Sequence, residues 1–161
     1  MRPVRRISGL LGALALAALG GCGSDDSPDT PAACVAGPQA YLRALEAAPA
    51  EVRLDGATPI SDCLVEEQEP GAQAQVGEAI IAAATQLNRK IRRDPGGAET
   101  QRLGYLVGAV QEAASRTGGI HEDLVLRLDN AARYPGPQGE AFGAGFERVF
   151  GEGYTAGQEG G

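Results

Sequence analysis

The chain has no tryptophan, one histidine, one lysine and one methionine among its 161 residues, and aromatic residues make up only 4%. A hydrophobic core must therefore be built mainly from alanine, leucine, valine and isoleucine, a composition that favours helix. Basic residues are also scarce, because 14 lysines and arginines stand against 21 acidic residues, for a net charge of −7. Nucleic-acid binding normally needs a basic surface, so we expect no nucleic-acid partner.

Common catalytic motifs are missing as well. The sequence has no G-x-S-x-G nucleophile motif, no H-E-x-x-H zinc motif and no glycine-rich phosphate loop after a strand. The lone His121 is interpreted as a surface or capping residue, with a catalytic base or metal ligand as the alternative. Carboxylate chemistry, as in glycan cleavage, stays open through acids such as Glu66, Glu67, Glu78 and Glu112. We expect no enzyme activity, no cofactor and no metal site.

No apolar run reaches the roughly 20 residues that a membrane-spanning helix requires. The N-terminus instead has Arg2, Arg5 and Arg6, then a 13-residue apolar segment at 7–19, then the sequence Leu19-Gly20-Gly21-Cys22. An apolar segment of this length is typical of an export signal. The whole arrangement resembles the signal peptide and lipobox of bacterial lipoproteins, in which an aliphatic residue and two small residues precede a cysteine.

The resemblance covers the first 22 residues and implies a lipid anchor. It implies that a signal peptide of residues 1–21 is removed and that the Cys22 thiol carries diacylglycerol, with two or more acyl chains anchoring stably. It further implies that the protein is exported to the outer face of the cell membrane. In a bacterium with two membranes, Gly23 replaces the usual inner-membrane retention aspartate, so the outer membrane is expected.

Residues 22–33 are expected to form the lipidated cysteine and a disordered tether, because the segment is rich in turn-forming residues and lacks apolar periodicity. Eleven flexible residues reach roughly 20 Å, so the folded domain would lie close to the membrane. Beyond the tether, Cys34 and Cys63 form an even pair in an exported chain, which predicts a disulfide. Free thiols and a metal site are the alternatives.

Apolar periodicity predicts helices at about 38–48, 72–93, 99–115 and 120–133, and from Pro137 onward. Residues 52–56 are interpreted as an ordered loop closed by an Asp-Gly turn. Gly104 and Gly108, one helical turn apart, are interpreted as a site of close helix packing. The fold class predicted is a small irregular all-α bundle of four to five helices with one disulfide. Its helical domain would span residues 34–154, followed by a disordered tail at 155–161.

Two clusters are candidate interaction sites. Phe142, Phe146, Phe150 and Tyr154 recur every four residues and would form one ridge of a helix, interleaved with glycines that weaken it. The ridge could dock on the bundle, or it could be loosely held and present aromatics to a partner or apolar ligand. The second cluster is basic and closes the helix at 72–93; its members are Arg89, Lys90, Arg92 and Arg93.

The basic cluster has two interpretations. Its cations could complement the carboxyl end of the helix dipole, or they could contact anionic lipid headgroups or a wall polymer. For the whole chain, the sequence favours a non-catalytic interaction or structural module of the cell envelope. It would be held to the membrane by its lipid, with another envelope protein or a wall polymer as partner. A helical domain that binds a small apolar ligand or lipid, and a carboxylate-based cell-wall enzyme, are the alternatives.

Overall fold

The structure, a computed structural model, describes residues 29–133 and 143–161. Cys22 and Phe142, two of the predicted site residues, therefore lie outside the described residues. Within these ranges, no helix has the length and hydropathy that crossing a bilayer would require. The described elements are, in chain order, η1 (Ala32–Val35), α1 (Pro38–Ala44), η2 (Leu45–Ala47), β1 (Arg53–Leu54), β2 (Thr58–Pro59), η3 (Ile60–Cys63), α2 (Pro70–Ile91), α3 (Ala98–Ser115), α4 (Glu122–Ala132) and α5 (Ala144–Gly160).

Prolines and glycines set most helix ends close to where the sequence predicts them. Pro38 and Pro70 occupy the first turns of α1 and α2, where a missing N–H and a fixed φ suit a helix start. Between α3 and α4 the chain turns at Gly118 and Gly119, which have φ of 61° and 92° and so adopt the left-handed region that favours glycine. The predicted helices at 38–48, 72–93, 99–115 and 120–133 correspond to α1 with η2, α2, α3 and α4.

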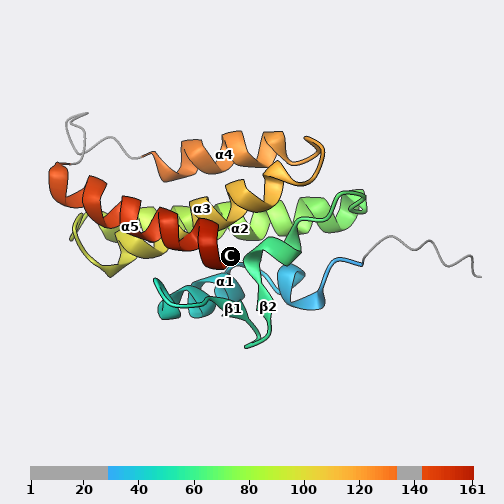
Figure 1. The fold of residues 1–161 in the computed structure, drawn as a ribbon, viewed down its shortest axis with the longest axis horizontal. Helices are drawn as coiled ribbons and strands as arrows, with labels where there is room; N and C mark the ends of the chain where they lie inside the picture. Colours follow the sequence, from blue (N-terminus) through green and yellow to red (C-terminus); the bar gives the residue numbers. More distant parts are fainter. Residues whose placement is uncertain (1–28, 134–142) are drawn as a thin grey trace, which may run out of the picture.

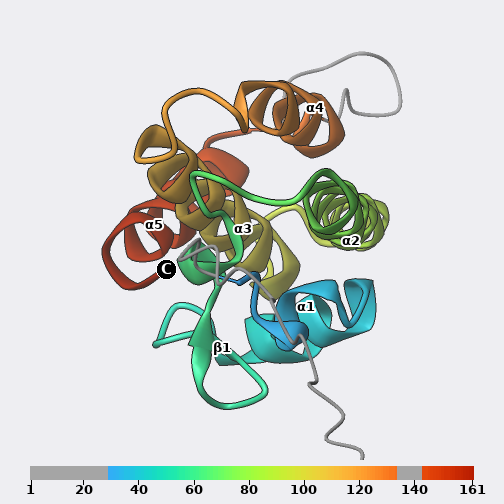
Figure 2. The same cartoon turned by 90° about the vertical axis from the view of Figure 1, so that its right-hand side faces the viewer.

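Helix α3 lies at the centre of the bundle. Seen end-on, α1, α2, α4 and α5 surround it (Figure 2), and every residue from Leu103 to Val110 is buried. A helix that is apolar on all sides is expected only where neighbours cover it on all sides. The all-α fold class predicted from the sequence is therefore confirmed, including the single disulfide.

The long helices run back and forth along one axis, so the molecule has two distinct ends. Helices α2 and α4 finish at the end where α3 and α5 begin (Figure 1). The described chain starts at the opposite end, next to the first turn of α2 (Figure 1). An Asn88 Nδ2 to Ala131 O hydrogen bond of 2.6 Å ties the last turns of α2 and α4 together.

Helix α5 packs on α3 in a parallel orientation through glycines on both helices. A Cβ atom at Gly104 or Gly108 would overlap the α5 backbone, and one at Gly153 or Gly157 would overlap the α3 backbone. The predicted close packing at Gly104 and Gly108 is thus confirmed. The disordered tail predicted at 155–161 is wrong, because α5 continues to Gly160 and Gly157 is buried against α3.

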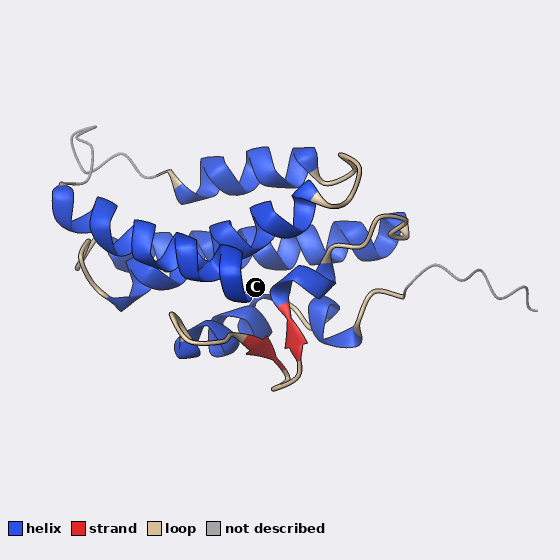
Figure 3. Cartoon of the chain, in the orientation of Figure 1, coloured by secondary structure: helices blue, strands red, loops and turns tan. Residues whose placement is uncertain are grey.

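Two smaller features differ from the sequence-based expectation. Residues 52–56 were expected to be a loop, but β1 and β2 pair antiparallel in a short hairpin, Arg53 with Pro59 and Leu54 with Thr58 (Figure 3). The Asp55 carboxylate accepts hydrogen bonds from the backbone N–H groups of Ala57 and Thr58, which stabilises the turn. Part of the predicted tether, residues 32–33, belongs to η1 and packs on the domain.

Candidate functional site

The predicted disulfide is present and joins η1 to η3. Cys34 in η1 and Cys63 in η3 are fully buried and bonded to each other, across 29 residues of sequence. The buried Tyr41 hydroxyl donates a 3.0 Å hydrogen bond to the Cys34 carbonyl oxygen. Burial without a compensating charge raises the pKa of this phenol well above its usual range. The start of the described chain is thus fixed to the bundle covalently.

A buried polar network forms a second connection between the N-terminal segment and the bundle. Gln68 Nε2 donates to Thr30 Oγ1 at 2.8 Å and to the Cys63 carbonyl oxygen at 2.9 Å. Its Oε1 lies 2.8 Å from His121 Nε2, and His121 Nδ1 lies 2.9 Å from Thr117 Oγ1. The interpretation of His121 as a surface residue is therefore wrong, since the residue is 1% exposed. It occupies the N-cap position of α4, but its side chain makes no capping hydrogen bond. Burial lowers its pKa.

The end of the molecule where the described chain starts is acidic. Asp29, Asp62 and Arg116 line one surface depression, and the Glu66 carboxylate lies against Gly118. Residues 29–35, 60–71 and 115–124 carry seven acidic residues against the single base Arg116. We refer to these seven residues as the acidic end: Asp29, Asp62, Glu66, Glu67, Glu69, Glu122 and Asp123.

The opposite end is basic. The predicted cluster occupies the last turn of α2 and the residues just after it, and all four side chains are exposed. The Asn88–Ala131 hydrogen bond brings a fifth exposed cation, Arg133, beside this cluster from the end of α4. We refer to these five residues as the basic end: Arg89, Lys90, Arg92, Arg93 and Arg133. Sequence reasoning missed Arg133 because only the packing of α4 on α2 places it there.

The acidic neighbours of the basic end are few. Glu99 in the first turn of α3 pairs with Lys90 at 3.7 Å and with Arg102 at 3.3 Å. With the first turn of α5, residues 89–102, 130–133 and 143–148 carry seven basic residues against Asp94, Glu99 and Glu147. The charge of the described residues is therefore polarised along the long axis, with an excess of negative charge where the described chain starts and of positive charge at the other end.

The aromatic ridge docks on the bundle. The rings of Phe146, Phe150 and Tyr154 stack in sequence, with centroids 5.5 and 6.4 Å apart, and all three pack against the core. The Tyr154 hydroxyl donates a 2.6 Å hydrogen bond to Gln111 Oε1 on α3. Gln111 Nε2 in turn donates to Asp129 Oδ1 on α4 at 2.9 Å. The ridge is thus held in place, which favours the docked interpretation over a loosely held segment.

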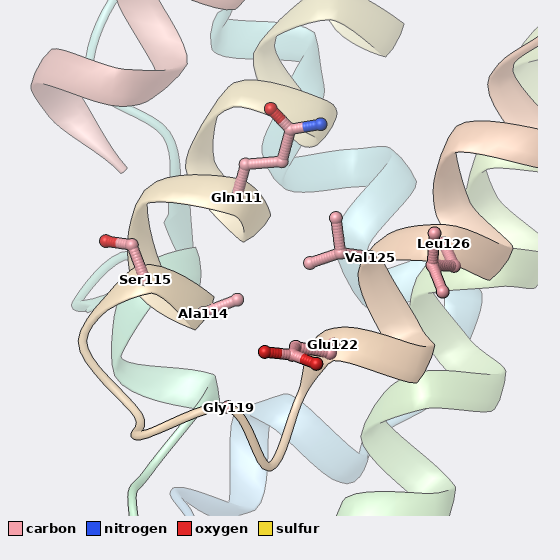
Figure 4. Close-up of a pocket in the computed structure, with 7 residues that line it drawn as sticks. All are labelled: Gln111, Ala114, Ser115, Gly119, Glu122, Val125 and Leu126. Atoms are coloured by element: carbon pink, nitrogen blue, oxygen red, sulfur yellow. The ribbon is translucent and has the colours of Figure 1, made fainter.

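A largely apolar groove lies between α3 and α4. It has a volume of about 500 Å³, and Figure 4 shows Val125 and Glu122 projecting from α4 toward Ala114 on α3. Leu126 on its rim is 64% exposed, and Ile120 nearby is 41% exposed. Sequence reasoning missed this groove, because its lining comes from residues that alternate with the buried stripes of both helices. The lining residues are Gln111, Ala114, Ser115, Gly119, Glu122, Val125 and Leu126.

The acids that left carboxylate chemistry open are spread over different elements. Glu66 and Glu67 lie in the loop before α2, Glu78 lies on α2 and Glu112 lies on α3. Among residues 29–133 and 143–161, no three His, Cys, Asp or Glu side chains come together in a way that could hold a metal ion. Compared with known proteins, the chain matches no protein-family model, no curated protein and no solved structure.

Proposed function

We propose that this protein is a lipid-anchored, non-catalytic interaction module of the bacterial cell envelope. The observation that carries the proposal is the place where the N-terminal segment joins the folded domain. The described chain starts at the acidic end, where the Cys34–Cys63 disulfide and the Thr30–Gln68 hydrogen bond fix it to the bundle. The segment that would carry the lipid is therefore joined to the folded core by a covalent bond and a hydrogen bond.

The separation of the acidic end from the basic end also supports the proposal. Cys22 and Asp29 are only seven positions apart, and seven Cα–Cα steps span at most about 25 Å. A lipid on Cys22 would therefore keep the acidic end near the bilayer. The exposed basic end would then be the surface farthest along the bundle from the anchor, where another envelope component can reach it.

Fractionation of cells that produce the Cys22→Ala variant tests the anchor. The full-length protein is expected in the membrane fraction, and the variant is expected in the soluble fraction of the envelope or in the medium. A Cys34→Ser/Cys63→Ser double variant is the matched control, because it removes the other two cysteines and leaves the lipid site intact. Membrane association of the Cys22→Ala variant would contradict the proposal.

A second candidate function is binding of a small apolar ligand in the α3–α4 groove. The observation that favours it is the apolar lining of the roughly 500 Å³ groove between Ala114 and Val125. The neutral dye N-phenyl-1-naphthylamine would then bind at one saturable site. Val125→Trp would block that site, whereas Thr85→Trp, an equal enlargement at an exposed position of α2, would leave it intact. Equal binding by both variants would exclude the groove as a ligand site.

A further inference from the structure

We infer that the basic end binds an extended polyanion, an anionic envelope polymer with repeated phosphate or carboxylate groups. The inference rests on the proposed function, since the lipid anchor decides which way the basic end faces. The chemical class of the ligand, in contrast, is inferred from the structure alone. Arginine presents a planar fork of N–H donors that pairs with phosphate and carboxylate oxygens, and four of the five residues of the basic end are arginines.

The arrangement of the cations favours a ligand with repeated charges. Arg89 lies in the last turn of α2, Arg93 follows two residues after the end of this helix, and the Asn88–Ala131 hydrogen bond brings the end of α4, with Arg133, to the same end of the molecule. All five residues are exposed, so anionic groups can approach them from solvent. A compact single anion would contact only one or two of them, whereas a chain of anions laid across both helix ends contacts more of them.

Helix dipoles alone do not account for the positive charge. A helix terminus carries about half an elementary charge, negative at the carboxyl end and positive at the amino end. This effect is confined to the last turn of a helix, and α2 ends in four exposed cations, Arg89, Lys90, Arg92 and Arg93. Four cations exceed what half an elementary charge requires, so dipole compensation explains only part of the cluster.

The direction of the basic end favours a polymer over lipid headgroups of the anchoring membrane. The 22 residues of α2 separate the two ends of the molecule by about 33 Å. Electrostatic attraction between exposed charges is screened over about 8 Å at physiological ionic strength. With the acidic end held near the bilayer, the basic end lies several screening lengths from the headgroups and faces the space beyond.

The test measures binding of fluorescent inorganic polyphosphate to the full mature protein in detergent, over a range of salt concentrations. An Arg89→Gln/Arg93→Gln/Arg133→Gln variant is expected to lose at least tenfold in affinity. The slope of log affinity against log salt should fall in magnitude by about two to three, since roughly one counterion is released per cation contact. The matched control is Arg43→Gln/Arg116→Gln/Arg127→Gln, which removes three exposed cations elsewhere and should change affinity less than twofold.

Three results would overturn the inference. One is absence of polyphosphate binding by the wild-type protein. Another is an equal loss in both triple variants, which would indicate a response to net charge alone. The third is binding to vesicles rich in phosphatidylglycerol without binding to polyphosphate, which would make lipid headgroups the ligand. Fractionation of the Arg89/Arg93/Arg133 variant separates this inference from the anchor, because that variant should stay in the membrane fraction even if polyphosphate does not bind.

Discussion

Gln68 joins three segments of the chain that are far apart in sequence. Its amide donates to Thr30 and to the Cys63 carbonyl oxygen, which fixes its Oε1 as the acceptor that faces His121. Neutral His121 must therefore carry its proton on Nε2. Its Nδ1 lies 2.9 Å from the Thr117 hydroxyl oxygen, and that hydroxyl donates to the Ala114 carbonyl oxygen at 2.8 Å. A single buried side chain thus sets both the tautomer of the histidine and the position of the N-terminal segment.

The lowered pKa of His121 predicts that the domain loses stability on mild acidification. The unfolded chain has a histidine pKa near 6.5, so below about pH 6.5 it binds more protons than the folded chain. The contribution of neutral His121 is fully present above this pH and is lost as the pH falls toward the lowered folded pKa. The free energy of unfolding in urea should therefore drop between pH 7.5 and pH 5.5.

The variant His121→Gln is the control for this prediction. It should be less stable than wild type at pH 7.5, because the buried hydrogen bonds are imperfectly replaced. Its stability should change less between pH 7.5 and pH 5.5, because no histidine is left to titrate. An equal drop in wild type and variant would mean that other groups account for the pH dependence.

Loss of the disulfide is expected to lower the free energy of unfolding. In the chain-entropy account, closing a loop of about 30 residues stabilises a fold by roughly 3.5 kcal/mol. We expect the Cys34→Ser/Cys63→Ser variant to lose about this much free energy of unfolding, and reduction of the wild type to have a similar effect. Urea unfolding with and without reductant measures both. A variant as stable as the oxidised protein would show that the Gln68 network alone holds the N-terminal segment.

At the scale of elements, the α3–α5 contact depends on which glycines face the partner helix. Gly157 lies against the Tyr105 backbone, whereas a Cβ at Gly151 on the same helix would meet nothing within 4 Å. Gly157→Ala is therefore expected to push the helices apart and destabilise the fold by about 1–3 kcal/mol. Gly151→Ala should instead stabilise it, by up to about 1 kcal/mol, because alanine has the higher helix propensity. Urea unfolding of both variants checks the prediction, and shifts of the same sign would contradict it.

These glycines also explain what the sequence could and could not predict about the elements. The positions of Pro38 and Pro70 and the apolar stripes of α2 and α3 are local features, so the helices there were predictable. The final segment reads as a poor helix, since glycine costs up to about 1 kcal/mol in a helix interior. Its continuation past Tyr154 depends on the contact of Gly157 with α3, which no local pattern reveals. The burial of His121 could not be predicted from local sequence either, because its partner Gln68 lies 53 residues away in the chain.

At the scale of the whole molecule, the charge polarity is a product of topology. After the first 24 residues the sequence mixes acids and bases, and the cluster at 89–93 is the basic group that stands out there. The polarity appears only when the loops before α2 and between α3 and α4 meet at one end, and the carboxyl ends of α2 and α4 meet at the other. Those arrangements bring Arg133 to the basic end and seven acids to the opposite end.

This polarity predicts the orientation of the anchored protein. In lipidated protein bound to neutral phosphatidylcholine vesicles, a fluorophore attached through Glu69→Cys, before α2, should lie closer to the bilayer than one attached through Arg93→Cys. The separation of about 33 Å along α2 exceeds the reach of the chain from Cys22 to Asp29, which is at most about 25 Å. Energy transfer to an acceptor dye in the membrane should therefore be clearly stronger from position 69. The Cys22→Ala background should give no transfer from either position, and equal transfer from both in the lipidated protein would mean that the bundle lies flat on the bilayer.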